Sequence, residues 1–277
     1  MFTIKKECEL FDVSGRTAIV TGGSGVLCSE MAKALGAAGA NVVILARNTV
    51  RIDAVLQEIL DCRGVALGLE ADVLDRNTLI KVKEKVLDKF GSIDILVNGA
   101  GGNRAGATTN PKQTFFDLPI QELSAVFDLN FLGSLLPSQI FGSVMADSGR
   151  GVIVNISSAS SFRPMTRVVG YSGAKAAINN FTEWLAVYMA QEYSPEIRVN
   201  AIAPGFFIAE QNYSLLIQPN GEYTERGNKI LTNIPMARFG DPKDLVGTLL
   251  WLVSDASKFV TGTIINVDGG FNAFSGV

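Results

Sequence analysis

The most informative absence is histidine, which does not occur anywhere in the 277 residues. Its absence excludes Ser-His-Asp and Cys-His catalytic schemes and every histidine-ligated metal site. The three cysteines, Cys8, Cys28 and Cys62, have no metal-binding spacing, and their odd number fits reduced structural thiols. We therefore expect no metal, and proton transfer has to use tyrosine, lysine, carboxylates or water.

Charge is also scarce, because 18% of the residues are charged and the formal net charge is −3. Such a balance gives no electrostatic footprint for nucleic acid or an anionic membrane. No apolar run approaches the roughly 20 residues of a membrane span. The first residues, 1–7, lack the apolar core of a signal peptide. These absences predict a cytoplasmic protein with neither a nucleic-acid nor a membrane partner.

What the chain does have is a regular alternation of apolar, strand-like runs with amphipathic, helix-like segments. This alternation predicts an α/β fold, a Rossmann-type doubly wound parallel sheet in a single domain covering 1–277. The expected strands are 17–20, 41–45, 65–69, 93–97, 151–156, 197–202 and 263–267, and the expected helices are 26–38, 50–62, 75–90, 120–146, 171–192 and 241–253. The segment 206–240 does not continue this strand-helix alternation and is predicted to be a lid over a ligand.

The first expected strand is followed by the glycine-rich sequence Thr21-Gly22-Gly23-Ser24-Gly25. Glycines in this turn let the backbone approach a pyrophosphate, which the N-terminus of the next helix stabilises. A glycine-rich turn that binds nothing is the alternative. The position after a buried first strand favours the nucleotide.

The second strand ends in Leu45-Ala46-Arg47-Asn48, without the carboxylate that would hold a ribose 2′-hydroxyl. Arg47 suits a 2′-phosphate, so NADP(H) is the favoured cofactor, with NAD(H) as the alternative. A solvated arginine at a strand end is the competing interpretation. Asp72, after the third strand, and Asn98-Gly99-Ala100, after the fourth, are predicted to border the same crevice.

Tyr171 and Lys175 lie four residues apart on an expected helix, which brings both side chains to one face. A nearby cation would lower the pKa of a phenol toward neutrality and make it a useful proton donor. Ser158 stands 13 residues before Tyr171, at the end of a strand. The neighbouring Ser157, Ser160 and Ser161 compete with Ser158, and the offset alone selects it.

Together these segments resemble the short-chain dehydrogenase/reductase family, from about residue 11 to the C-terminus. Within the family the chain is similar to the D-mannonate oxidoreductase (fructuronate reductase) branch. The segments that carry the resemblance are Thr21-Gly22, Asn98-Gly99-Ala100-Gly101-Gly102-Asn103, Phe127 to Gly133, Ser158, Phe162-Arg163-Pro164, Tyr171 with Lys175, Ala203-Pro204-Gly205-Phe206-Phe207, Glu210-Gln211-Asn212 and the tail from Asp268.

The resemblance implies hydride transfer between a nicotinamide and a secondary alcohol or ketone, in a tetramer with two-fold axes. Tyr171 would be the general acid/base, and Ser158 would hold the reacting oxygen. Lys175 would bind the nicotinamide ribose, and Asn130 would hold a water linking Lys175 to solvent. The implied cofactor-binding residues are Gly22, Ser24, Gly25, Val26, Leu27, Arg47, Asp72, Val73, Asn98, Gly99, Ala100, Tyr171, Lys175, Pro204, Gly205 and Phe207.

Several positions depart from the family pattern. Val26 and Cys28 stand where the second and third glycines of the nucleotide motif are expected, so the loop should be reshaped but functional. Ala209 replaces a threonine that often contacts the nicotinamide amide. Arg104 stands where the branch would have a histidine.

A sugar-acid substrate needs a cation for its carboxylate, and Arg163 and Arg104 are the candidates. Asn103, Ser158 and Gln211 complete the predicted substrate site. The preferred interpretation is oxidoreduction of D-mannonate and D-fructuronate. The alternatives are another polyol or keto acid, such as gluconate oxidised at C5, and a nucleotide-sensing protein without catalysis. Intact Ser158, Tyr171 and Lys175 argue against a sensor, which needs no proton donor.

Overall fold

A computed structural model describes residues 9–276, except the side chains of Glu210 and Gln211. Seven strands form one sheet in the order β3-β2-β1-β4-β5-β6-β7, and each neighbouring pair is parallel. The strands are β1 (Thr17–Thr21), β2 (Asn41–Ala46), β3 (Val65–Glu70), β4 (Ile95–Asn98), β5 (Gly151–Ile156), β6 (Ile197–Pro204) and β7 (Ile264–Val267). The predicted doubly wound parallel sheet is confirmed.

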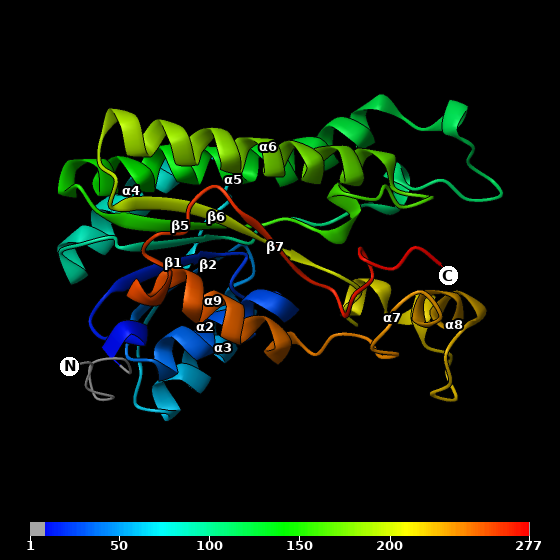
Figure 1. Ribbon diagram of the computed structural model, residues 1–277, viewed down its shortest axis with the longest axis horizontal. Coiled ribbons are helices and arrows are strands. Elements are labelled where there is room, and N and C mark those ends of the chain that lie inside the picture. The colour runs from blue at the N-terminus through cyan, green and yellow to red at the C-terminus, as the bar shows by residue number, and fades with distance from the viewer. Residues whose placement is uncertain (1–8, 277) are drawn as a thin grey trace.

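Helices cover both faces of the sheet (Figure 1). One layer holds α2 (Val26–Ala37), α3 (Thr49–Asp61) and α9 (Val246–Val253), and the other holds α4 (Arg76–Phe90), α5 (Ile120–Ser148) and α6 (Val169–Glu192). Each layer has its own apolar core, since the side chains of a strand alternate between the two faces. In β1, for example, Val20 packs in the first core and Ile19 in the second.

Local sequence explains several helix ends. Asp75 caps α4 by accepting from the backbone N–H groups of Asn77 and Thr78, and Gly91 ends that helix with a φ of 76°. The helix expected at 241–253 is instead a 3-10 turn, Pro242–Leu245, followed by α9. Pro242 has no backbone N–H to donate, which suits the first residue of such a turn.

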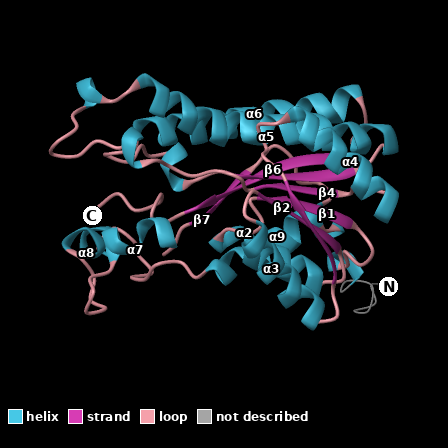
Figure 2. Cartoon of the chain, turned by 180° about the vertical axis from the view of Figure 1, so that it is seen from behind, coloured by secondary structure: helices cyan, strands magenta, loops and turns pink. Residues whose placement is uncertain are grey.

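The segment 206–240 leaves the sheet after β6 and forms α7 (Glu210–Leu216) and α8 (Glu225–Leu231). Its two ends meet, because the backbone N–H of Gly240 donates to the carbonyl of Phe206 at 2.9 Å. Leu216, Ile217 and Phe239 give the segment a small core of its own. Figures 1 and 2 show α7 and α8 beyond the carboxyl ends of the strands, beside the C-terminal tail.

Among the described residues, no helix is both long and apolar enough to cross a membrane. Cys28 is a buried free thiol and Cys62 an exposed one. Cys8 and the N-terminal segment 1–7 lie outside the described residues.

Candidate active site

A groove of about 550 Å³ runs along the carboxyl ends of the strands, a volume typical of ligand sites. It joins the predicted nucleotide end to the predicted catalytic end. Sixteen of the predicted residues line it: Gly22, Ser24, Gly25, Val26, Leu27, Arg47, Asp72, Val73, Gly99, Ala100, Ser158, Tyr171, Lys175, Pro204, Gly205 and Phe207.

At the nucleotide end, the turn between β1 and α2 packs against the loop after β4. Gly22 has a φ of 64°, and a Cβ there would lie 2.9 Å from the backbone of Gly99 and Ala100. The Thr21 hydroxyl accepts from the N–H groups of Gly99 at 3.1 Å and Ala100 at 3.2 Å. The first turn of α2 has no side-chain cap, because its N-cap is Gly25. Its backbone donors therefore face the groove without a side-chain competitor.

Cys28, which replaces the third glycine of the motif, contacts the same loop. A Cβ on Gly99 would lie 2.1 Å from the Cys28 sulfur, so the thiol fills the space that a side chain at 99 would need. Burial raises the pKa of the Cys28 thiol to about 12, with the Lys175 charge acting in the opposite direction. The thiol is therefore a neutral packing group in the floor of the groove.

Two arginines line the predicted nucleotide end of the groove. Arg47 is exposed after β2, and Arg51 is exposed in the first turn of α3. Sequence reasoning missed Arg51, although its place at the start of the helix after β2 was the available signal. Asp72 lies opposite, and its carboxylate accepts from the N–H of Leu74 at 2.9 Å.

Asn98 differs from the other predicted cofactor residues, because its side chain does not line the groove. It is buried and donates to the Ser138 hydroxyl at 2.9 Å and the Asn155 side chain at 2.8 Å. The last residue of β4 directs its side chain between β5 and α5, so it joins those elements. Its Oδ1 is buried without a hydrogen-bond partner.

At the catalytic end, Tyr171 and Lys175 share one face of α6, as their spacing predicts. The Lys175 ammonium lies 5.6 Å from the centre of the Tyr171 ring and donates to the Ile156 carbonyl at 2.7 Å. Burial lowers the pKa of Lys175 to about 8. Burial raises the pKa of Tyr171, and a hydrogen bond with Ser158 opposes it. This direction differs from the expected lowering by Lys175, because desolvation outweighs the other contributions.

The serines after β5 form two different sets of hydrogen bonds. Ser157 points into α6, with its hydroxyl 2.5 Å from the Asn179 Oδ1, and Ser161 donates to the Ser158 carbonyl. The Ser158 hydroxyl accepts from the N–H and hydroxyl of Ser160 at 3.2 and 3.0 Å. Ser158 keeps its own hydroxyl proton to donate, and its hydrogen bond with the Tyr171 phenol acts to lower the pKa of that phenol.

Asn130 is fully buried in the middle of α5, beside the catalytic end but outside the groove lining. Its Nδ2 donates to the carbonyls of Gly102 and Val126, each at 2.7 Å, and its Oδ1 accepts from the Gly102 N–H at 3.1 Å. A Cβ on Gly101 would meet both Asn130 Oδ1 and the Lys175 ammonium. Asn130 therefore fixes the loop after β4 against Lys175. Its expected water-binding role stays a prediction.

Of the predicted substrate residues, Ser158 lines the groove, whereas Asn103, Arg104 and Arg163 do not. Arg163 is exposed, and its guanidinium donates to the Phe274 carbonyl at 2.7 Å, which attaches the C-terminal tail. Arg104 is exposed outside the groove lining, at the start of a short 3-10 turn. Asn103 donates to the Thr108 hydroxyl at 2.8 Å, while its Oδ1 is buried without a partner. The side chain of Gln211 lies outside the described part of the chain.

Asn212, the residue after Gln211, lines the groove, although sequence reasoning did not select it. The Asn212 side chain accepts from the Ala209 N–H at 2.7 Å and donates to the Phe207 carbonyl at 2.8 Å. It therefore holds the start of the 206–240 segment in a fixed turn at the edge of the groove.

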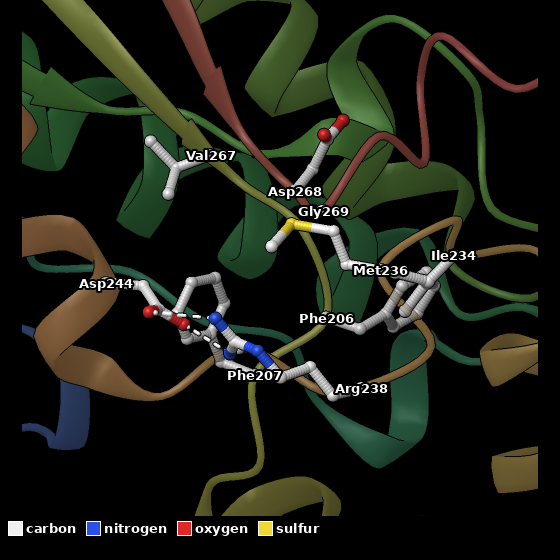
Figure 3. A pocket seen from close by; sticks show the side chains of 10 residues that line it. Phe206, Phe207, Ile234, Met236, Arg238, Asp244, Val267, Asp268 and Gly269 are labelled. Atoms are coloured by element: carbon white, nitrogen blue, oxygen red, sulfur yellow. Dashed lines mark hydrogen bonds and ion pairs between the residues drawn. The ribbon is translucent and has the colours of Figure 1, made fainter.

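Figure 3 shows a second, smaller cavity of about 170 Å³ that shares the walls Phe206 and Phe207 with the groove. Its ionic groups are already paired. Arg238 forms two bonds to Asp244, at 2.6 and 3.1 Å, and Asp268 accepts from backbone N–H groups in the C-terminal turn. These contacts brace the base of the 206–240 segment and already engage both carboxylates of the cavity.

Comparison with known proteins gives a consistent result. Residues 16–216 match the family model described as short chain dehydrogenase. The chain is 48% identical to the uncharacterized oxidoreductase UxuB of Bacillus subtilis over 275 residues, which are 96% of this chain and 98% of the relative.

Two solved structures are similar along nearly the whole chain. One is a Haemophilus influenzae protein provisionally named a D-mannonate oxidoreductase, with bound NAD: 45% identity, a TM-score of 0.90, and coverage of 96% of this chain and 98% of that one. The other is a Beutenbergia cavernae protein provisionally named an NAD(P)-dependent gluconate 5-dehydrogenase, with bound NADP: 30% identity, a TM-score of 0.84, and coverage of 96% and 100%.

Proposed function

This chain belongs to the short-chain dehydrogenase/reductase family and is a nicotinamide-dependent oxidoreductase, and we propose that its substrate pair is D-fructuronate and D-mannonate. One observation carries the chemistry. Tyr171, Ser158 and Lys175 stand together at one end of a groove whose other end has the backbone and charge for a dinucleotide.

The groove fits a nicotinamide dinucleotide. The uncapped start of α2 suits the pyrophosphate, and Gly22 and Gly99 keep the two flanking loops close because neither has room for a Cβ. Arg47 and Asp72 line one end of the groove and would hold the adenosine part, and Lys175, at the other end, would hold the nicotinamide ribose. When bound, the nicotinamide supplies or accepts the hydride.

The chain's own residues handle the proton and the developing charge. A raised pKa keeps the Tyr171 phenol protonated at neutral pH, so Tyr171 can deliver its proton to the oxygen of a ketone as that oxygen becomes negative. Ser158 donates a hydrogen bond to the same oxygen and stabilises its charge. Asn130 positions the loop after β4 beside Lys175 through Gly102. In the reverse direction Tyr171 takes the alcohol proton.

The substrate is the finer part of the proposal. The provisional name of the Haemophilus influenzae structure supports D-mannonate, and gluconate oxidised at C5 is the alternative that the Beutenbergia cavernae structure supports. A cofactor-oxidation assay with a panel of uronic and keto-aldonic acids and neutral ketoses tests it. Highest catalytic efficiency with D-fructuronate is expected. If the neutral ketoses are reduced as efficiently, the sugar-acid proposal is wrong.

We propose NADP(H) as the preferred cofactor, with NAD(H) as the alternative, because β2 is followed by Arg47 and not by a carboxylate. Arg47→Ala should lower the catalytic efficiency with NADPH by about 10-fold or more, since it removes a charge-assisted bond to the 2′-phosphate. Efficiency with NADH serves as the internal control and should barely change. A wild-type preference for NADH that the substitution leaves intact would show that Arg47 only faces solvent.

We also propose a homotetramer, as the family resemblance implies. Aromatic side chains crowd an outer face of α6, where Trp184 and Tyr188 stack at 4.9 Å and Trp184 and Val187 are more than half exposed. The C-terminal tail, in contrast, packs on its own chain through Phe271 and Phe206, at 5.1 Å. Exposed aromatic patches of this kind suit a subunit contact.

Trp184→Glu should therefore yield smaller species than the wild type in light scattering at micromolar concentration. Glu183→Gln, at the next position of the same helix, is the matched control and should keep the wild-type mass. A wild-type monomer would refute the tetramer, and an unchanged mass for the Trp184 variant would show that this face is not the contact.

The proposed lid is the segment 206–240, which begins beside the groove at Phe206 and Phe207 and is pinned at its base by Gly240. A cytoplasmic location stays a prediction from the sequence.

A further inference from the structure

An asparagine outside the groove joins the serine turn after β5 to the helix that carries the catalytic pair. Asn179 lies on α6 four residues after Lys175, on the same side of that helix. Its Oδ1 accepts from the Ser157 hydroxyl at 2.5 Å, and its Nδ2 donates to the Ser161 hydroxyl at 2.9 Å. These two serines flank Ser158 in sequence. One side chain of α6 therefore holds the turn at two points, one before Ser158 and one after it.

The serine hydroxyl protons fix the direction of these bonds. Ser161 uses its one proton for the Ser158 carbonyl at 2.6 Å, so it can only accept from Asn179. Ser157 gives its proton to Asn179, because its other hydrogen-bond partners lie at 3.3 Å or more. A side-chain amide can accept from one serine and donate to the other. An apolar side chain of similar size could form neither bond.

The position of Ser158 relative to Tyr171 depends on this connection, because the two residues come from different elements. Ser158 starts the short 3-10 turn after β5, whereas Tyr171 lies in α6. Both residues line the groove, and a hydrogen bond joins their side chains. Asn179 and Ser161 do not line the groove. Their hydrogen bonds to each other and to the Ser158 carbonyl therefore fix the turn to the helix from behind the groove.

We propose that Asn179 is a positioning residue, which holds Ser158 in the place beside Tyr171 that proton transfer requires. It acts through Ser157 and Ser161, because its own side chain lies outside the groove. This inference rests on the proposed function and adds a residue that the spacing of Tyr171 and Ser158 does not indicate. Misplacing a reacting group by about 1 Å can cost about 100-fold in rate, so the loss of Asn179 should be visible in turnover.

The test uses two substitutions. Asn179→Leu keeps the approximate size of the side chain and removes both bonds to the serines, and Ser161→Ala removes the link to the Ser158 carbonyl. The assay is reduction of D-fructuronate, or of whichever compound of the panel the wild type reduces best. Each substitution should lower kcat about 10- to 100-fold, and neither should exceed the loss in Ser158→Ala. Affinity for NADPH, from a fluorescence titration, should stay near the wild-type value.

A double-mutant cycle separates positioning from a general structural role. In a Ser158→Ala background, Asn179→Leu should cause no further loss of kcat, because the hydroxyl that Asn179 positions is already gone. Asn180→Leu, at the next and exposed position of α6, is the matched control and should keep the wild-type kcat. Ser161→Ala deletes a single oxygen atom, so it tests the same connection if Asn179→Leu does not fold.

Wild-type kcat in both Asn179→Leu and Ser161→Ala would overturn the inference. It is also overturned if Asn179→Leu lowers kcat equally with and without the Ser158 hydroxyl, or if NADPH affinity falls in parallel with kcat, since either result indicates a structural role only. The failure of the proposed function looks different. Wild-type turnover in Ser158→Ala would contradict the proposed chemistry and remove the basis of the inference. A wild type that prefers another compound of the panel would change the substrate and leave the role of Asn179 to be decided by the same cycle.

Discussion

Tyr171→Phe should lower turnover by about 10²- to 10⁴-fold, the usual contribution of a positioned general acid. The substitution keeps the aromatic ring beside Lys175 and removes only the phenolic proton that Ser158 helps to orient. Cofactor affinity should therefore stay near the wild-type value. Steady-state kinetics of ketone reduction and a fluorescence titration with NADPH measure the two effects separately.

Tyr193→Phe is a suitable control, because Tyr193 is an exposed tyrosine that follows the far end of the same helix. It should retain wild-type turnover. Near-normal turnover in Tyr171→Phe would remove Tyr171 from the mechanism, and a parallel loss of NADPH binding would show that its ring, and not its proton, matters.

Gly99→Ala should weaken cofactor binding about 10- to 100-fold, because overpacking of this kind typically costs 1–3 kcal/mol. The new Cβ would lie 2.1 Å from the Cys28 sulfur and 3.0 Å from the Thr21 carbonyl oxygen, so the loop after β4 has to move. That loop forms one wall of the groove. Titration with NADPH measures the loss of cofactor affinity, and the midpoint of thermal unfolding measures the loss of stability.

Cys28→Ala should restore part of the loss, since the Cys28 Cβ alone would lie at an ordinary 3.5 Å from the new methyl group. The contact with Thr21 would remain, so the rescue should be incomplete. Gly173→Ala is the matched control, because a Cβ there meets nothing within 4 Å. Independent effects of Gly99→Ala and Cys28→Ala in a double-mutant cycle would show that the thiol does not set the position of the loop.

Features that depend on local pattern could be predicted from the sequence. Buried parallel strands are continuous apolar runs, so β5 and β6 could be predicted from the sequence. The spacing of Tyr171 and Lys175 likewise predicted that both lie on one face of a helix. The glycine-rich turn after β1 likewise specified the position of the nucleotide end, because its place between a strand and a helix is a local property.

Features that depend on tertiary contacts could not be predicted in this way. Asn98 belongs to a recognisable motif, yet its side chain turns into the core, where Ser138 and Asn155 are 40 and 57 residues away in sequence. Arg163 follows Ser158 closely, but the tail it binds is 111 residues downstream.

The two ends of the groove differ in how deeply their residues are buried. This difference determines which substitutions the protein is expected to tolerate. Arg47 and Asn48 are exposed after the end of β2, whereas Lys175 and Asn130 are buried among main-chain partners. Substitutions at Arg47 should therefore cost little stability, as is usual for surface positions. With the role proposed for Arg47, we expect cofactor preference to be easier to change by substitution than proton transfer, because the end of β2 is exposed and Lys175 and Asn130 are buried.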